Sequence, residues 1–464
     1  MIEYAFYAVV AATLLVAFQN WRSALYLCLL LDVLRDPVRK LASGHSVLIT
    51  QSVSLVWLAI AVAVLLQERQ RLAVMARRHP QLQTAARLLV AALVPGAVMA
   101  TINFESGWRL ALLGGASYLA LIPGILIGYA FPRCLAEITR FLAFYCIVNS
   151  VALISGVAEY AHWGWPGLGG VGSFTWFRDR PGYRVELISG FYRSPDLLGM
   201  HAAGVCLFAL VLVVAGSRRD RFAWFLPVIW GTVLLLLAGR RKMIGIPIVF
   251  AMSFVYLMFR RTGKAFRAVW YLAAGATAMV LVFVFATELG LSKSYTTYAS
   301  SLWTQEGTGR SSTEVLDSVL TTLDQSGVFG RGLGSATQGS HHIMSGGVTW
   351  QEDAGGKLFV ELGLLGVALF ACAAWLLIRT CGSALRAFPP ESTAFRLQAG
   401  LMSVVAGNVA SFIVSHQAYS GDPTSVCLVL FCLGSVLALP GVLAAGQPVA
   451  RTPSLGQSLA VPEF

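Results

Sequence analysis

Apolar runs separated by short polar connections recur from one end of the chain to the other. A helix needs roughly twenty apolar residues to cross about 30 Å of hydrocarbon, and most of these runs reach that length. A further apolar piece, 23–34, is short and carries Asp32, so we expect a re-entrant or interfacial segment there. About twelve membrane spans are predicted, over residues 3–20, 46–66, 87–104, 110–131, 138–159, 196–216, 222–239, 243–259, 268–288, 358–378, 397–415 and 425–446.

This pattern predicts an all-α polytopic membrane protein. Residues 1–446 would form one integral membrane domain, and residues 447–464, rich in Pro, Gly, Ser and Gln, would form a disordered cytoplasmic tail. The composition agrees, because 57% of the residues are hydrophobic and only 12% are charged, about half the usual charged share. A soluble protein is therefore excluded. A transporter or channel is the class to weigh against any enzyme.

The formal net charge of +12 would suit a nucleic-acid-binding protein, but its distribution indicates membrane topology instead. Basic residues concentrate in alternate short loops, which the positive-inside rule places in the cytoplasm together with both termini. These residues are Arg69, Arg71, Arg77, Arg78, Arg133, Arg140, Arg218, Arg219, Arg221, Arg260, Arg261, Lys264, Arg267, Arg379, Arg386 and Arg396. We therefore expect no nucleic-acid partner.

The same topology places two long loops outside, over 160–195 and 289–357. Loops of this length are often functional. No internal repeat relates the two halves of the chain, which weighs against a transporter built from inverted repeats. No Asp-x-Asp pair and no Cys/His metal spacing occur, so neither a metal nor a cofactor is predicted.

Three groups of basic residues lie against the charge bias, on the predicted outer face. Arg240 and Arg241 occupy a tight hairpin in "LLLLAGRRKMIGIPIV", Arg310 precedes a helix start in "GRSSTEVLDSVL", and Arg193 stands at the mouth of a span in "GFYRSPDLLG". Their side chains either snorkel to the membrane surface or hold an anion. Arginine suits phosphate because its planar group donates two hydrogen bonds at once, and the first amides of a helix also bind anions.

Two adjacent carboxylates, Glu352 and Asp353, precede the apolar run at "TWQEDAGGKLFVELGLLG". Acids at this place can simply mark the start of a helix, where negative charge is favourable. Alternatively, one of them accepts a proton as a general base. Glu361, inside the following span, is expected to bond a neighbouring helix.

Taken in order, these motifs resemble the O-antigen ligase and polymerase superfamily of bacterial envelopes. The likeness rests on the span headed by "SPDLLG", the basic hairpin, "GR" before an outer helix, "FGRGLG", and an acid leading into "ELGLLG". A more distant resemblance is to the SEDS peptidoglycan polymerases. By position, Arg240 and Arg310 match the two outer arginines of the family. Glu352 falls where the ligases have His and the SEDS proteins have Asp, which favours a polymerase over a ligase.

The resemblance implies a GT-C-like glycosyltransferase in the bacterial inner membrane that makes exopolysaccharide or O-antigen. Arg240, Arg241, Arg310 and Arg193 would bind the pyrophosphate of a polyprenyl-linked oligosaccharide, and Glu352 or Asp353 would deprotonate the acceptor sugar hydroxyl. The reaction would invert the anomeric configuration without metal. Membrane lipid, a flippase and a chain-length regulator are the other expected partners.

Other functions remain open at this stage. They are a ligase that transfers the glycan to lipid A core, a flippase or other transporter of lipid-linked sugars, and a glycosyltransferase that uses polyprenyl phosphate sugars. In the last, the base would be an acid of the first outer loop, such as Asp36. A transporter would need polar groups along a path through the membrane, whereas the predicted spans are almost free of charge.

Overall fold

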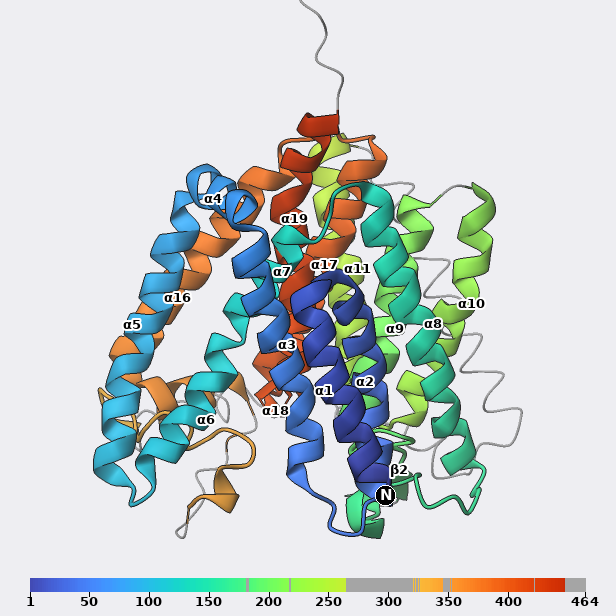
Figure 1. Cartoon of the computed structure of the whole chain (residues 1–464), viewed down its shortest axis with the longest axis vertical. Coiled ribbons are helices and arrows are strands. Elements are labelled where there is room, and N and C mark those ends of the chain that lie inside the picture. Colours follow the sequence, from blue (N-terminus) through green and yellow to red (C-terminus); the bar gives the residue numbers. More distant parts are fainter. Residues whose placement is uncertain are drawn as a thin grey trace, which may run out of the picture.

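The computed structural model describes residues 1–180, 183–216, 218–263, 326–344, 351, 353–420 and 422–446, with single positions at 320, 322 and 324. Most of this is helix, with one short β-hairpin and a few irregular loops (Figure 1). The helices are α1 (Ile2–Gln19), α2 (Trp21–Leu41), α3 (Val47–Gln67), α4 (Arg69–Arg78), α5 (Pro80–Asn103), α6 (Gly107–Leu119), α7 (Leu121–Ala130), α8 (Leu135–Tyr160), α9 (Pro195–Ala215), α10 (Arg218–Leu237), α11 (Arg241–Thr262), α16 (Ala354–Leu385), α17 (Thr393–Val414), α18 (Gln417–Ser420) and α19 (Pro423–Gly446). Single 3-10 turns, η1 and η2, cover Val171–Ser173 and Ser340–His342, and strands β1 (Trp176–Arg180) and β2 (Tyr183–Leu187) pair antiparallel.

The prediction of an all-α polytopic membrane protein is confirmed. Within the described residues, ten helices are long and apolar enough to cross a membrane, counting α6 and α7 as one. They match ten of the twelve predicted spans. The span predicted at 222–239 corresponds to α10, whose apolar part, Arg221–Leu237, is shorter than the rest, and the one predicted at 268–288 lies outside the described residues.

The segment 23–34 is not a short re-entrant piece. It belongs to α2, a continuous 21-residue helix packed against α1, α3 and α8. At 1.5 Å per residue this helix is about 30 Å long. Its charged residues had argued against a span, but Asp32, Arg35, Asp36 and Lys40 are all buried inside the protein. Partners on other helices, described below, compensate these charges.

The two ends of the described chain lie at opposite ends of the molecule. The N-terminus lies beside the β-hairpin, whereas α19 ends at the other pole (Figure 1). The expectation that both termini lie on the same side of the membrane therefore does not fit this bundle. We call the pole with β1, β2 and the α10–α11 turn the hairpin end, and the opposite pole, with α4 and the α7–α8 connection, the arginine end.

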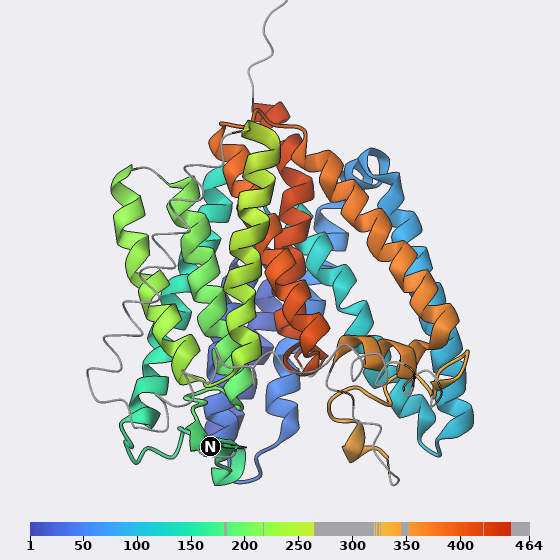
Figure 2. The same cartoon turned by 180° about the vertical axis from the view of Figure 1, so that it is seen from behind.

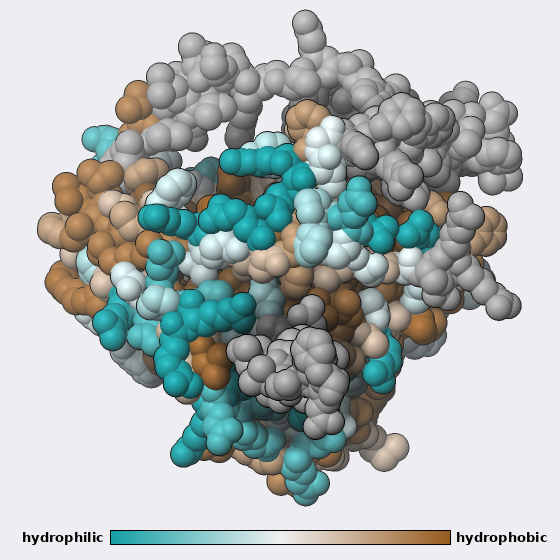
Figure 3. Space-filling view, turned by 90° about the horizontal axis from the view of Figure 1, so that it is seen from above, coloured by the Kyte–Doolittle hydropathy of each residue, from teal (hydrophilic) through white to brown (hydrophobic). Residues whose placement is uncertain are grey.

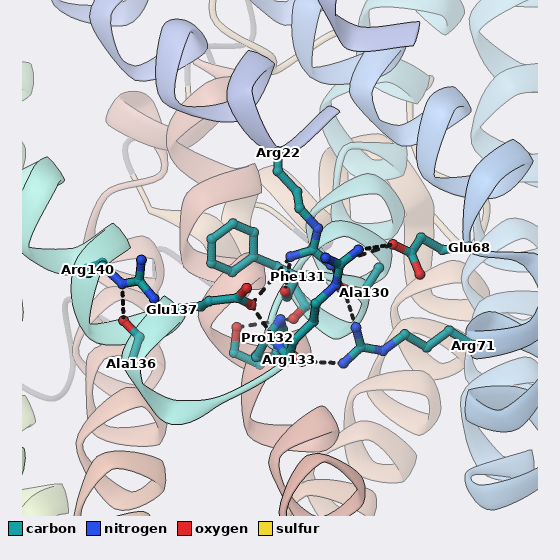
Figure 4. Close-up of polar contacts among 12 residues, drawn as sticks. Arg22, Glu68, Arg71, Ala130, Phe131, Pro132, Arg133, Ala136, Glu137 and Arg140 are labelled. Atoms are coloured by element: carbon teal, nitrogen blue, oxygen red, sulfur yellow. Dashed lines mark hydrogen bonds and ion pairs between the residues drawn. The ribbon is translucent and has the colours of Figure 1, made fainter. Parts of the chain in front are cut away.

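The arginine end carries the short basic loops. Seen from this pole, hydrophilic side chains collect over the centre while hydrophobic ones gather on the flanks (Figure 3). Arg22 donates to the carbonyl oxygens of Ala130 and Phe131, and Arg71 reaches the same stretch from α4 (Figure 4). These carbonyls close the end of α7, where helix acceptors lack partners and cations are favoured.

A smaller lobe, made of α5, α6 and the long helix α16, stands beside the main bundle (Figure 2). Its own core consists of Leu93, Tyr118, Leu333 and Leu362. Helix α16 breaks at Gly363, whose φ of 66° and ψ of −178° are not helical. The first part of α16 therefore lies across the hairpin end, and the rest rises along α5 (Figure 2).

The glycine-rich segment "FGRGLG" docks onto this lobe. Its backbone makes two hydrogen bonds of 2.7 Å, from Arg331 N to Val360 O and from Leu333 N to Gly96 O. Side chains would block this approach, because a Cβ added to Gly334 would lie 2.0 Å from the carbonyl oxygen of Leu110. The glycines of this segment thus allow a close approach to the helix backbones of the lobe.

Candidate functional site

The basic hairpin forms the turn between α10 and α11 at the hairpin end. Gly239 adopts a left-handed φ of 67°, which lets the chain reverse before Arg240 caps α11. Arg240 is about one-fifth exposed (22%) and lies 3.2 Å from a carboxylate oxygen of Asp196, in the first turn of α9. Lys242 lies 3.5 Å from the other oxygen of Asp196. Two cations thus share one carboxylate, which leaves positive charge in excess at this turn.

Arg241 begins α11, but its side chain lies outside the description, so the choice between Arg240 and Arg241 rests on the geometry of Arg240 alone. The expected partner Arg310 also lies outside the described residues.

Arg193, the third predicted cation, stands just before α9 and faces Asp36 of α2. The backbone N of Arg193 donates to Asp36 at 3.0 Å, and its guanidinium lies 3.5 Å from the same carboxylate. Lys40 fixes the preceding loop through two 2.7 Å hydrogen bonds to the carbonyls of Gly190 and Tyr192. Asp36 is therefore buried and neutralised by Arg193, which makes it a poor candidate for the base of a polyprenyl phosphate transferase.

A fourth cation, Arg35, was not predicted. Its guanidinium lies 2.6 Å from Asp422 and 3.0 Å from Asp32, and it donates to Thr424 at 3.1 Å. Burial alone would raise the pKa of Asp422, but the positive charges of Arg35 and Arg193 hold that pKa below its ordinary value. The sequence pattern that could have predicted this charged cluster is the spacing of Asp32, Arg35 and Asp36, because it places the three charges on one face of α2.

Behind Arg35, a histidine continues the polar network into the bundle. His201 of α9 lies 3.9 Å from Asp32 and contacts the hydroxyl of Tyr145 at 3.0 Å. The ring of Tyr192 stacks on His201 with centroids 4.6 Å apart. The polar groups on this side of α2 therefore range from the partly exposed Arg193 to fully enclosed side chains such as His201.

The acidic segment begins α16 at the same end of the bundle. Asp353 is the N-cap, and its carboxylate accepts a hydrogen bond of 2.7 Å from Gly356 N. Capping a helix is the alternative to catalysis that the sequence predicted for these acids. Glu352 lies outside the described residues, but Gln351 directly before it is described, and its carbonyl contacts His416 Nε2 at 2.8 Å.

Residues 415 and 416 connect the acidic segment to the basic turn. Lys242 donates to the hydroxyl of Ser415 at 2.6 Å, and the next residue, His416, holds Gln351. Burial, followed by the nearby charge of Lys357, lowers the pKa of His416 to about 4. His416 is therefore neutral at pH 7 and donates from Nε2, with Nδ1 facing the hydroxyl of Ser420 at 2.8 Å.

Glu361 has the structural role predicted for it. One carboxylate oxygen accepts hydrogen bonds from Ala336 N at 3.0 Å and from Thr337 Oγ1 at 2.8 Å. The other accepts one from Tyr118 at 2.8 Å and pairs with Lys357. This buried cluster locks the segment 333–340 between α6 and α16, so Glu361 is not available for chemistry on a substrate.

Within the described part of the chain, no group of three or more His, Cys, Asp or Glu side chains is placed to hold a metal ion. The chain matches no protein-family model and no curated protein. Any assignment of function therefore rests on the residues and their geometry.

Proposed function

We propose that the protein is a membrane glycosyltransferase that uses a polyprenyl-pyrophosphate-linked glycan, as its resemblance to the O-antigen ligase and polymerase superfamily implies. One observation carries the proposal. The basic turn and the acidic segment, far apart in sequence, lie at the same end of the bundle and are connected through Lys242, Ser415, His416 and Gln351. A cation for the leaving group and an acid for the acceptor are thereby brought to one end.

In the proposed reaction, an acceptor sugar hydroxyl attacks the anomeric carbon of the donor glycan. The bond from that carbon to the pyrophosphate oxygen breaks, and polyprenyl pyrophosphate leaves with the bonding electrons. Arg240 and Arg310 stabilise the negative charge that develops there, with Arg193 nearby. Glu352 takes the proton of the hydroxyl, with Asp353 as the second candidate. Direct displacement inverts the anomeric centre and needs no metal or cofactor.

The hairpin end would face the outer side of the bacterial inner membrane. Support comes from the exposed Arg69, Arg77, Arg78, Arg133 and Arg140 at the opposite pole, since basic loops stay in the cytoplasm. With this orientation the C-terminus is cytoplasmic and the N-terminus lies outside. Single cysteines added at residue 2 and at residue 446 of a cysteine-free variant would test it with an impermeant maleimide. Labelling of position 446 in sealed spheroplasts would overturn the orientation.

The decisive test of activity is chain lengthening by the purified protein in liposomes supplied with lipid-linked repeat units. Glu352→Gln keeps size and hydrogen bonding but removes proton acceptance, so polymer formation should fall by roughly a hundred- to ten-thousand-fold. Asp353→Asn is the matched control, and it should have the smaller effect. Normal polymer from Glu352→Gln with loss from Asp353→Asn would identify Asp353 as the base. Full activity in both variants would show that the two acids only begin the helix.

A transporter of lipid-linked sugars is the second candidate, and the structure strengthens it in one respect. The predicted spans are nearly uncharged, but α2, which was not counted among them, buries Asp32, Arg35 and Asp36 in the bundle. Ionisable groups in such places often mark substrate or proton paths. Transbilayer movement of the lipid-linked glycan in the same liposomes, without chain lengthening, would favour this function over the enzyme.

A further inference from the structure

The loop 160–195 exposes aromatic side chains at the hairpin end. Trp163 is 66% exposed, Trp165 45%, Phe174 56% and Phe177 47%. A sheet edge and irregular loops cannot lie in hydrocarbon, because their backbone groups would lack partners there. This loop therefore lies in the aqueous or headgroup layer, where lipid tails do not cover the exposed aromatic rings.

The register of the hairpin separates its two faces. Val185 and Leu187 are buried, and Leu187 packs against Gly239 of the basic turn. Phe177 pairs with Glu186, so both point to the other face. The guanidinium of Arg184 lies 4.0 Å from the centroid of the Phe177 ring on that face. The outer face thus combines a flat ring with one cationic and one carboxylate side chain.

Trp176 connects this hairpin to the basic turn. Its ring lies 4.8 Å from that of Phe174, and the guanidinium of Arg240 lies 5.8 Å from the Trp176 ring centroid. The indole Nε1 of Trp176 and the Nε of Arg240 are both buried without a hydrogen-bond partner in the protein. Two unpaired donors in neighbouring side chains are costly unless a ligand rich in oxygen accepts from them.

We propose that the hairpin is a glycan-binding platform, on which sugar rings of the lipid-linked substrate stack against Phe177 and Phe174. The C–H groups on one face of a sugar ring pack on an aromatic ring. A sugar on Phe177 bonds Arg184 and Glu186 through its hydroxyl groups, whereas a sugar on Phe174, on the side of Trp176, accepts from Trp176 and Arg240. The inference rests on the proposed function, since it places the glycan beside the pyrophosphate site. It adds a substrate subsite that the arginines and acids do not provide.

The test measures binding of water-soluble hexasaccharides of glucose, galactose, rhamnose and N-acetylglucosamine to the full-length protein in nanodiscs, by saturation-transfer NMR. Stacking tolerates different sugars, so at least one hexasaccharide should bind. Phe177→Ala and Phe174→Ala should each weaken that binding by about three- to tenfold. Trp108→Ala is the matched control, because Trp108 is also exposed (57%) and also carries an arginine, Arg109, over its ring at 5.2 Å, but it lies on α6.

Binding that is unchanged in both phenylalanine variants, or weakened equally by Trp108→Ala, would overturn the platform, as would a failure of every hexasaccharide to bind. If the rings only anchor the loop at the membrane surface, the variants would lower the unfolding temperature in nanodiscs and leave glycan binding intact. Because binding requires no turnover, an inactive protein that still binds glycan through Phe177 would reject the proposed reaction and retain the platform.

Discussion

At the arginine end, Arg22 and Arg71 donate to backbone carbonyls, whereas at the hairpin end Arg35, Arg193 and Arg240 face carboxylates. The carbonyls at the arginine end lie at the close of α7, and the carboxylates that Arg22 also reaches there, Glu68 at 3.5 Å and Glu137 at 3.4 Å, are partly exposed. The acceptors at the hairpin end are carboxylates buried inside the protein. Arginines at the two ends therefore have different roles. Those at the arginine end fix the end of a helix, and those at the hairpin end balance buried carboxylates.

The largest effect is expected from Arg35→Leu, which leaves Asp32 and Asp422 buried without their shared cation. Breaking a buried ion pair on one side costs about 3–5 kcal/mol, so the variant should unfold at a much lower temperature or fail to accumulate. Thermal unfolding of the purified protein in detergent measures the effect. The triple variant Arg35→Leu, Asp32→Asn and Asp422→Asn should recover part of the loss, and no recovery would contradict the charge-balance argument.

Arg240→Ala should affect activity rather than stability. Lys242 remains 3.5 Å from Asp196 in this variant, so the carboxylate keeps a cationic partner. Loss of a group that stabilises the leaving pyrophosphate should lower polymer formation by about a hundredfold or more, and Arg240→Lys should rescue poorly because ammonium lacks the planar fork. Arg260→Ala, at the arginine end, is the control and should polymerise normally. Full activity in Arg240→Ala would show that this arginine only balances Asp196.

His416 should make the hairpin end sensitive to acid. Its pKa is lowered to about 4 in the folded protein, mainly by burial, against an ordinary value near 6.5. On acidification the unfolded chain therefore takes up this proton at a higher pH than the folded protein does. The stability that the neutral His416 contributes is complete above about pH 6.5 and is lost as the pH falls toward 4. About 2 kcal/mol should disappear between pH 7 and pH 5. His416→Gln should be less sensitive by that amount when unfolding temperatures are compared across this range, and equal slopes would contradict it.

The smallest effects should come from the arginine end. Arg22→Ala removes hydrogen bonds to two carbonyls, the stacking of Arg22 on Trp21 at 4.5 Å, and partly exposed ion pairs with Glu68 and Glu137, which together should cost about 1–2 kcal/mol. Arg133→Ala removes an arginine that is 64% exposed and 3.9 Å from Glu68, so its cost should be below about 0.5 kcal/mol. If Arg133→Ala destabilised the protein as much as Arg35→Leu, the contrast between the two ends would be wrong.

Most helices could be predicted from the sequence, because a long apolar run crosses a membrane as a helix. The sequence misled at α2, where charge was taken as a sign of exposure. The compensating partner of Arg35 is Asp422, which lies 387 residues further along the chain, and no local pattern indicates such a pairing. Glu361 was correctly predicted as a structural acid, and Asp353 has the capping geometry of one of the two alternatives that the sequence left open.

One consequence of the smaller lobe concerns biosynthesis. Asn103 of α5 bonds Arg331, 228 residues later, and Tyr118 of α6 bonds Glu361, 243 residues later. At a synthesis rate of about 5–20 residues per second, α5 and α6 wait roughly 10–50 s in the membrane before these partners exist. During that interval the hydroxyl of Tyr118 and the glycine-lined faces of both helices are open to lipid or to an insertion chaperone. The lobe therefore closes after translation of α16, and a chain that stops before residue 361 leaves α5 and α6 without their core.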